Sequence, residues 1–310
     1  MGCCSRNMAS DLIVIVNAGA RKADDAAVHR QLVEMFVAKG VRADVQLARS
    51  GAEIAELARR AVKTETSVVV AAGGDGTINA VASELVGSNK ILGVLPLGTL
   101  NHLAKDLGMP LDIESAVDVI TQQRLAQIDI GEVNGRYFLN NSGLGLYPGI
   151  VHEREQQQAQ GRSKWLAFFS ALLIIIHRYP LLTVRLSTEA RELRRRTPMV
   201  FVGNNEYELQ GLNMGSRRFL DRGQLFLYVT REMSRWRLLK IGLAALFGRL
   251  GDTRDFDAIS VREVSVQARR RRLRVALDGE VVVMRLPLRY RIHPAALRVI
   301  VPADQKESGR

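Results

Sequence analysis

The chain has 310 residues, of which 47% are hydrophobic and 25% charged; this length and composition exclude a disordered chain and leave room for two ordinary domains. The formal net charge of +12 favours anionic partners such as nucleotide phosphates, nucleic acid or an anionic bilayer, without choosing among them. The two adjacent cysteines, Cys3 and Cys4, exclude a disulfide framework and a cysteine metal site, which favours a reducing, cytoplasmic compartment.

The first part of the chain alternates short apolar runs with segments of helical spacing. Strands are predicted at Leu12–Val16, Ala43–Leu47, Ser67–Ala72 and Ile91–Leu95. Helices are predicted at Ala26–Ala38, Ala52–Val62 and Thr77–Val86. Strands that alternate with helices and are apolar on both faces predict a mostly parallel sheet covered by helices.

From about residue 126 the pattern changes to strands with few helices between them. Strands are predicted at Gln127–Val133, Arg136–Asn140, Leu182–Leu186, Met199–Val202, Gln224–Thr230, Val261–Gln267 and Arg272–Leu277. Helices are predicted at Lys164–His177 and Trp236–Leu250. We therefore predict an α/β domain over residues 8–127 and a β-rich sandwich or partly closed barrel over 128–302, with 1–7 and 303–310 disordered. The apolar run Trp165–Ile176 is shorter than the roughly 20 residues of a membrane-spanning helix, so we expect none.

A glycine-rich turn, Gly73-Gly74-Asp75-Gly76-Thr77, follows one of the apolar runs and opens a predicted helix. Glycine is needed where the backbone approaches a ligand closely, and free N–H groups at a helix N-terminus can cradle phosphate. Because a carboxylate in such a turn repels phosphate, we expect Asp75 to act through Mg²⁺ or as a proton acceptor. A plain tight turn with Asp75 as the helix cap is the alternative.

A second polar segment, Pro96-Leu97-Gly98-Thr99-Leu100-Asn101-His102, follows the next apolar run. The carboxyl ends of neighbouring parallel strands form the usual ligand crevice of an open α/β sheet. We expect Thr99 and Asn101 to point their hydroxyl and amide groups into that crevice. His102 fits a packing residue at the start of a helix better than a catalyst.

A third polar segment, Asp278-Gly279-Glu280, follows the predicted strand Arg272–Leu277. Two carboxylates that flank a glycine suit proton abstraction or Mg²⁺ coordination. Asp-Gly is also a strong signal for an ordinary hairpin turn, so both interpretations stay open at this point.

Taken together, these segments resemble the diacylglycerol kinase catalytic family, which includes bacterial lipid kinases and sphingosine kinases and has an NAD-kinase-like fold. The resemblance covers about residues 10–302. It is carried by the segments GGDGTIN, PLGTLNHLAKDLGMP, NNSGLG, VGNN and DGE, which begin at Gly73, Pro96, Asn140, Val202 and Asp278.

The resemblance implies an ATP-dependent lipid kinase that transfers the γ-phosphate of ATP to a lipid hydroxyl, with diacylglycerol giving phosphatidic acid as the default reaction. It implies that Glu280, with Asp278 nearby, activates the hydroxyl and that Asp75 orients Mg²⁺–ATP, in line with the need of a poor nucleophile for a positioned base. The implied ATP-binding residues are Gly73, Gly74, Asp75, Gly76, Thr77, Ile78, Asn79, Thr99, Asn101 and Asn17.

The chain departs from the family pattern at several positions. Ala80 replaces a common Glu, and Tyr147 stands where an Asp often occurs. In LDRGQL, residues 220–225, Arg222 takes the place of an Asp that holds a structural Mg²⁺ in some bacterial members. Asp221 could substitute, but Arg222 beside it would repel a cation, so we expect that metal site to be weak or absent. The Mg²⁺ that arrives with ATP is a separate ion and is still expected.

Other functions stay open. NAD kinase shares the GGDGT turn, although the PLGTLN segment argues against it, and the departures at Ala80, Tyr147 and Arg222 leave room for a degenerate kinase that only binds nucleotide. The chain lacks an aromatic stacking set and a nucleic-acid motif, so we expect no nucleic-acid partner.

A lipid substrate that stays in the bilayer implies a cytoplasmic enzyme that associates peripherally with the membrane. The basic runs Arg194–Arg196 and Arg269–Arg272 and the segment Trp236–Leu250 suit anionic headgroups and the membrane interface, or else are solvated basic faces. A homodimer would fit the resemblance.

Overall fold

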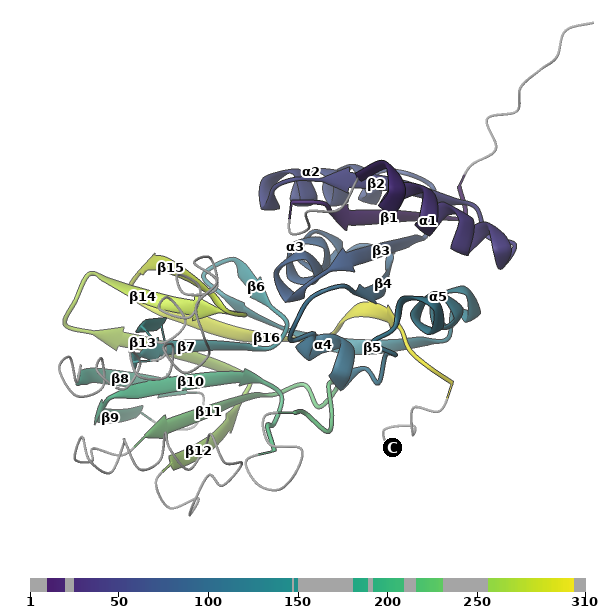
Figure 1. Ribbon diagram of the computed structural model, residues 1–310. Helices are drawn as coiled ribbons and strands as arrows, with labels where there is room; N and C mark the ends of the chain where they lie inside the picture. Colours follow the sequence, from purple (N-terminus) through teal and green to yellow (C-terminus); the bar gives the residue numbers. More distant parts are fainter. Residues whose placement is uncertain are drawn as a thin grey trace, which may run out of the picture. The chain divides into compact units, whose positions relative to one another are not determined.

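The structure is a computed structural model that describes residues 10–19, 25–146, 148–149, 181–188, 192–208, 216–230 and 256–303. They form two compact units, one comprising Met1–Ile128 with Ala296–Arg310 and the other Asp129–Ala295 (Figure 1). The division after Ile128 lies next to the expected boundary. Residues 296–302, however, were expected in the second domain and belong to the first unit, because the end of the last strand pairs there.

The first unit is built on a parallel sheet. Its strands, in spatial order, are β2 (Ala43–Ala48), β1 (Leu12–Asn17), β3 (Val68–Gly73), β4 (Ile91–Pro96) and the end of β16 (Leu288–Ile300). Every neighbouring pair is parallel, and β3 and β4 are buried along their whole length. The expectation of a parallel sheet is thereby confirmed. The strand β16 was not expected.

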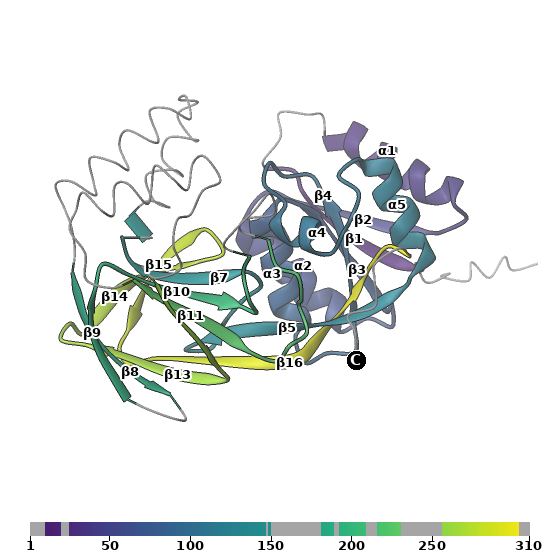
Figure 2. The ribbon, with the colours of Figure 1, turned by 90° about the horizontal axis from the view of Figure 1, so that it is seen from below.

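Helices connect the strands of this sheet (Figure 2). They are α1 (Asp25–Ala38), α2 (Gly51–Val62), α3 (Asp75–Leu85), α4 (His102–Asp106) and α5 (Ile113–Gln122). The three predicted helices are present, but α3 begins at Asp75, two residues before the expected start. Ser50 caps α2 by accepting a hydrogen bond from Glu53 N at 3.2 Å, which is the capping pattern that Ser followed by Glu three residues later predicts.

The second unit contains two antiparallel sheets. The first has the spatial order β12 (Phe256–Val261), β11 (Leu225–Thr230), β10 (Met199–Asn204), β7 (Asn141–Gly145), β14 (Arg272–Leu277) and β15 (Glu280–Arg285). The second contains β13 (Glu263–Ala268), β8 (Leu182–Thr188), β9 (Glu192–Thr197), the start of β16, the end of β5 (Leu125–Val133) and β6 (Arg136–Phe138). β5 and β16 thus have residues in both units.

A single apolar core lies between the two sheets of the second unit. Leu144, Val202 and Val275 contribute to it from one sheet, and Val266 and Tyr290 from the other. Residues alternate along these strands between buried and exposed, as β14 shows with Leu273 and Val275 inside. This arrangement is a β-sandwich, which confirms the sandwich that we weighed against a barrel.

Within the residues that the structure describes, no helix has both the length and the apolar character needed to span a membrane. Several expectations concern residues outside the described ranges. These are the helices at Lys164–His177 and Trp236–Leu250, the departure at Tyr147, and the disordered ends at 1–7 and 304–310.

Candidate functional site

The glycine-rich turn joins the carboxyl end of β3 to the first turn of α3. Gly73 ends β3, and a Cβ atom on it would lie 2.5 Å from Thr77 Oγ1, so no other residue fits there. Gly74 is the N-cap of α3, and no side chain of the described residues caps the helix. The first N–H groups of α3 therefore remain open to an anion, which the helix dipole also favours.

Side chains on either side of this turn hold its shape. Thr77 is buried and accepts a hydrogen bond from Asn17 Nδ2 at 3.0 Å, so the end of β1 is tied to the turn. Ile78 is fully buried, whereas Gly76 is exposed. The Oδ1 atom of Asn79 is buried and has no hydrogen-bond partner among the described residues. An unpaired buried acceptor is costly, so Asn79 Oδ1 is suited to meet a donor from a ligand.

The second polar segment packs directly against the first. Leu97 N donates to Gly73 O at 2.9 Å, and a Cβ atom on Gly98 would lie 2.5 Å from Gly74 Cα. Asp75 Oδ1 accepts a hydrogen bond from His102 N at 2.8 Å. The two segments are therefore one rigid structure at the carboxyl edge of the parallel sheet, as the adjacency of β3 and β4 requires.

Asn101 has a different environment from the expected one. Its backbone is left-handed, with φ of 50°, and its side chain is buried. The Asn101 amide accepts from Gly98 N at 3.1 Å and donates to Gly98 O at 2.9 Å, so it closes its own loop instead of presenting a free amide. Thr99 is exposed and its hydroxyl can reach a ligand, while His102 is exposed at the start of α4.

These residues fit a bound nucleotide phosphate with its Mg²⁺. The turn offers open N–H groups to the phosphate, and Gly73 has no space for a Cβ atom. Asn79 offers an unpaired oxygen, which suits the cation and not the phosphate. Asp75 uses one carboxylate oxygen on His102 N, and its other oxygen, Oδ2, accepts no hydrogen bond from the described residues. A carboxylate oxygen in this position is the type of ligand that Mg²⁺ prefers.

In the second unit, Asp278 and Gly279 form the hairpin turn between β14 and β15. Both have positive φ, 46° and 93°, and Leu277 pairs with Glu280 across the turn. This is the geometry for which Asp-Gly is favoured. Glu280, the first residue of β15, is exposed. The hairpin interpretation of this segment therefore describes its backbone, and the exposed Glu280 carboxylate is left for a chemical role.

The Asp278 carboxylate is turned back onto the segment that precedes β7. Its Oδ2 accepts from Leu139 N at 2.6 Å, and its Oδ1 accepts from Asn140 N at 2.8 Å and Asn141 N at 2.9 Å. Burial raises the pKa of Asp278 to about 6, although the three N–H donors and the charge of Arg217 act to lower it. Asp278 thus fixes the backbone of residues 139–141. Its carboxyl group also binds a proton more readily than an ordinary aspartate does.

A buried arginine, which the sequence did not single out, lies beside this anchor. Arg217 is 4% exposed; it donates to Leu139 O at 2.6 Å, to Asn204 O at 3.1 Å and to Asn140 Oδ1 at 2.7 Å. Asn204 in turn donates to Leu139 O at 2.8 Å. The NNSGLG and VGNN segments are therefore joined through Arg217, which no local sequence pattern distinguishes from the exposed arginines around it.

The segment considered for a structural metal is arranged around a different carboxylate, Asp129. This buried side chain accepts hydrogen bonds from Gly223 N at 2.6 Å, Asn205 Nδ2 at 3.1 Å and Ala295 N at 2.9 Å. Asp221 is exposed.

The guanidinium group of Arg222 stacks 3.9 Å from the centre of the Phe219 ring. The described residues contain no group of three or more His, Cys, Asp or Glu side chains that could hold a metal. They do not fit a structural Mg²⁺ at Asp221.

Comparisons with known proteins place both units in a family. Residues 11–133 match the model of the diacylglycerol kinase catalytic domain, and residues 148–301 match the model of the YegS C-terminal NAD kinase beta sandwich-like domain. A diacylglycerol kinase of Bacillus subtilis (strain 168) is 37% identical over 126 residues, which are 40% of this chain and 42% of that protein. One of Staphylococcus haemolyticus (strain JCSC1435) is 39% identical over 98 residues, 31% of this chain and 30% of that protein. The chain thus matches less than half the length of these relatives.

Solved structures are similar over nearly the whole chain. A diacylglycerol kinase structure from Bacillus anthracis str. Sterne aligns with a TM-score of 0.69 and 17% identity, covering 94% of this chain and 97% of the other. A second structure from the same organism aligns with a TM-score of 0.74 and 19% identity at the same coverage. At this identity the likeness establishes the fold, an α/β unit followed by a β-sandwich.

Proposed function

Since the chain belongs to the diacylglycerol kinase catalytic-domain family, we propose that it is a lipid kinase that transfers the γ-phosphate of ATP to a lipid hydroxyl, with diacylglycerol as the acceptor and phosphatidic acid as the product. The observation that carries this proposal is the joining of the two glycine segments. Gly73 and Gly98 leave no space for a side chain, and Asp75 is held by His102 N beside the open N-terminus of α3.

Phosphate binding is assigned to the first unit. The N–H groups at the start of α3 would hold the phosphate chain, with Gly73, Gly74, Gly76 and Thr77 shaping the backbone around it. Asn17 and Asn101 stabilise this backbone through their hydrogen bonds to Thr77 and Gly98. Thr99 and Asn79 offer polar atoms to the nucleotide and its cation. Ile78 packs below the turn.

Bound Mg²⁺ would neutralise charge that develops on the phosphate oxygens during transfer. Asp75 would hold it through Oδ2, the oxygen that His102 N leaves free. The His102 contact fixes the rotation of the carboxylate, so this residue is pre-oriented by the fold.

Proton acceptance is assigned to the second unit. Glu280 is exposed and is the better candidate to receive the proton of the lipid hydroxyl as its oxygen bonds to phosphorus and ADP leaves. Asp278 keeps both oxygens on backbone N–H groups, so we place it as the residue that positions the turn next to Glu280. The two carboxylates of the DGE segment therefore have different roles.

The proposal includes a cytoplasmic protein that meets its lipid at the membrane surface, without a nucleic-acid partner. A homodimer is compatible with it.

The decisive experiment is transfer of labelled phosphate from ATP to a panel of lipids in mixed micelles, with NAD present as a competing acceptor. Labelled phosphatidic acid that is lost in Glu280→Gln, but kept in the control Glu263→Gln on an exposed strand end of the same unit, would support the proposal. Labelled NADP would identify an NAD kinase instead. Bound ATP without any labelled product would identify a degenerate kinase that only binds nucleotide.

A further inference from the structure

Six arginines gather at one end of the β14–β15 hairpin. They are Arg269, Arg270 and Arg271 in the turn before β14, Arg272 and Arg274 on β14, and Arg285 on β15. All six are exposed, and Arg272 lies directly opposite Arg285 across the two strands. We call these six residues the arginine end. Leu286 N donates to Arg271 O at 3.1 Å, so the turns on either side of the hairpin are tied together here.

The arginine end lies beyond the part of β14 that is paired on both sides. β14 pairs with β7 over Val275–Leu277, whereas its pairing with β15 runs along the whole strand (Figure 1). Leu273 and Met284 on the inner face are buried in the sandwich core. The hairpin is thus anchored from inside, and the side chains on its outer face are exposed.

An aliphatic side chain lies among the arginines on this outer face. Val283 is 63% exposed and lies directly opposite Arg274. Because successive residues of a strand alternate between faces, Arg272, Arg274, Val283 and Arg285 share the outer side of the hairpin.

The charges of the arginine end are not neutralised by acidic side chains in the part of the chain that the structure describes. No ion pair joins any of the six guanidinium groups to a carboxylate of the described residues. The arginine run at residues 194–196 differs, because two of its side chains form ion pairs. Arg194 Nε lies 3.8 Å from Glu192 Oε1, and Arg195 Nε lies 3.7 Å from Asp257 Oδ2. Crowded like charges repel one another, so an anionic partner on this face gains their attraction without breaking existing ion pairs.

Protection of the sheet edge does not explain so many charges. β15 is the edge strand of its sheet, and a charged residue there discourages pairing with other chains. Only Arg285 of the six lies on that strand. Arg272 and Arg274 lie on β14, which β15 already covers, and the remaining three lie in the turn.

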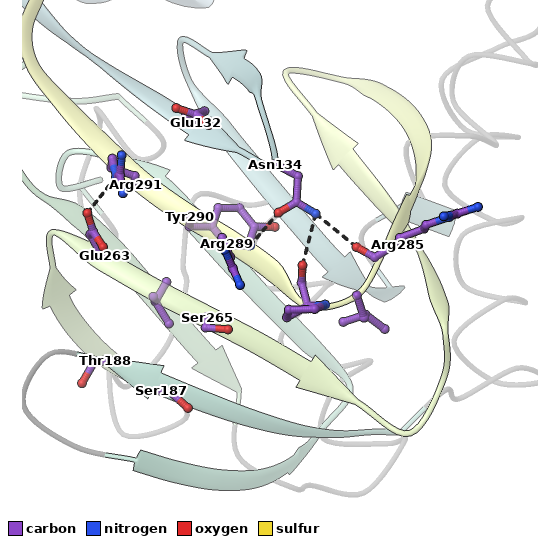
Figure 3. Close-up of a pocket in the computed structure, with 13 residues that line it drawn as sticks. Glu132, Asn134, Ser187, Thr188, Glu263, Ser265, Arg285, Arg289, Tyr290 and Arg291 are labelled. Carbon is purple, nitrogen blue, oxygen red and sulfur yellow. Dashed lines mark hydrogen bonds and ion pairs between the residues drawn. The ribbon is translucent and has the colours of Figure 1, made fainter.

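A nearby groove of about 830 Å³ is a weaker candidate for the anion site (Figure 3). It contains Glu132 and Glu263 as well as arginines, and Arg291 already pairs with Glu263 at 2.7 Å. Arg285 contributes to its edge, but its side chain extends away from the other labelled residues (Figure 3). The groove is therefore nearly balanced in charge, and the outer face of the hairpin is not.

We propose that the arginine end and Val283 form a docking surface for a bilayer that contains anionic phospholipid. Guanidinium groups bind phosphate, and an aliphatic side chain between them can enter the interface, which is the composition of membrane-docking surfaces. Residues 269–285 contain no aromatic side chain on which a nucleic-acid base could stack. The choice of a bilayer over other polyanions rests on the proposed function, since a kinase of membrane lipids meets its substrate there.

This surface is separate from the proposed chemistry. The Arg272–Arg285 pair is five residues along the hairpin from the Leu277–Glu280 pair, or about 17 Å at the rise of an extended strand. A phosphate held by the arginine end is therefore too far from Glu280 to be the reacting group. The arginine end would hold the protein on the bilayer and take no part in phosphate transfer.

The test is sedimentation of the full-length protein with vesicles of phosphatidylcholine alone and of phosphatidylcholine with phosphatidylglycerol. We expect binding to the anionic vesicles only, weakened by salt because these charges are exposed. The triple variant Arg272→Ala, Arg274→Ala, Arg285→Ala should bind about a hundredfold more weakly, at about fivefold for each arginine. The control is Arg194→Ala, Arg195→Ala, Arg196→Ala, which removes the same charge and should bind as the unmodified protein does. Unchanged thermal melting of both variants would establish that they fold.

Several outcomes overturn the proposal. Equal losses of vesicle affinity in both triple variants would show that net charge, and not this surface, governs binding. If the variant at Arg272, Arg274 and Arg285 bound anionic vesicles as well as the unmodified protein does, the arginine end would not be a docking surface. Preferential binding to double-stranded DNA or RNA over anionic vesicles, lost in the same variant, would reassign it to nucleic acid. Phosphorylation of a short-chain diacylglycerol in detergent should be equal in all three proteins. If no protein phosphorylates a lipid but the vesicle result holds, docking stands and the proposed kinase activity fails.

Discussion

The carboxylate of Asp278 lies 2.6 Å from the backbone nitrogen of Leu139, a residue 139 positions earlier in the chain. Two more backbone N–H groups, from Asn140 and Asn141, meet the same carboxylate. The acidic residue that follows β14 therefore holds the loop before β7 in place. Glu280, two residues later, is exposed and takes no part in these hydrogen bonds.

Replacing Asp278 with Asn should cost stability. An amide has one acceptor oxygen, so at least one of the three N–H groups loses its partner, at roughly 1–3 kcal/mol of unfolding free energy. Urea denaturation of Asp278→Asn measures this, with exposed Asp221→Asn as the control that should be neutral. Equal stability of both variants would mean that the three hydrogen bonds do not hold the loop.

The same variant should reveal a pH dependence. Burial raises the pKa of Asp278 to about 6 in the folded protein, from an ordinary value of 3.8, so the folded state holds this proton more tightly than the unfolded chain. The contribution of this proton to stability is complete below about pH 4 and is lost as the pH rises through about 6. The stability gap between the unmodified protein and Asp278→Asn should therefore narrow over that range. A gap that widens would show that the N–H donors outweigh burial.

Asp75→Asn should abolish phosphate transfer while leaving the fold intact. The amide oxygen can still accept from His102 N, so the two glycine segments stay joined, but the negative charge needed for Mg²⁺ is gone. We expect turnover to fall by about 100- to 1,000-fold with an unchanged melting temperature. Near-normal turnover would remove Asp75 from the mechanism.

Gly98→Ala should disturb both glycine segments at once. The new Cβ atom would lie 2.5 Å from Gly74 Cα and would force the two backbones apart. We expect the free energy of unfolding to fall by about 1–3 kcal/mol and the affinity for ATP to fall as well. Gly51→Ala, at the start of α2, is the control, because a Cβ atom there meets nothing within 4 Å and helix propensity favours alanine. Calorimetric titration with ATP and thermal melting of the two variants would separate them.

Arg222→Asp should create Mg²⁺-dependent stability, if this position has lost a metal ligand. The variant would place a second carboxylate next to Asp221 and remove the guanidinium group that stacks on Phe219. We expect at least about 1 kcal/mol of stabilisation by millimolar Mg²⁺ in the variant and none in the unmodified protein. Arg218→Asp is the matched control, since Arg218 stacks on the same ring at 5.4 Å. An unchanged melting temperature of Arg222→Asp with added Mg²⁺ would contradict the idea of a lost site.

The architecture could be predicted because its signals are local. Runs such as Ser67–Ala72, apolar on both faces and followed by glycine and a helix, specify a buried parallel strand wherever the rest of the chain goes. The strand β16 escaped prediction because Pro294 and the left-handed Ala295 interrupt its alternation, and its end pairs with β4, some 200 residues earlier in the sequence.

The site divides in the same way. Gly73, Asp75 and Gly98 stand out in the sequence because they lie in short polar segments, rich in glycine, that directly follow apolar runs. Arg217 and Asp129 do not stand out, because nothing near them in the chain marks an arginine or an aspartate that will be buried. Their partners, Asn140 and Asn205, come from segments more than 70 residues away.

The sequence by itself determined the two-part architecture, the family and the residues offered for phosphate binding and proton transfer, since each rests on spacing within a short stretch of chain. Only the tertiary structure decided which contacts those residues make. In the folded chain the Asn101 side chain hydrogen-bonds within its own loop, the Asp278 carboxylate accepts from three backbone N–H groups, and Glu280 is exposed. Hydrogen-bond partners and burial of this kind are set by segments that meet only when the chain folds.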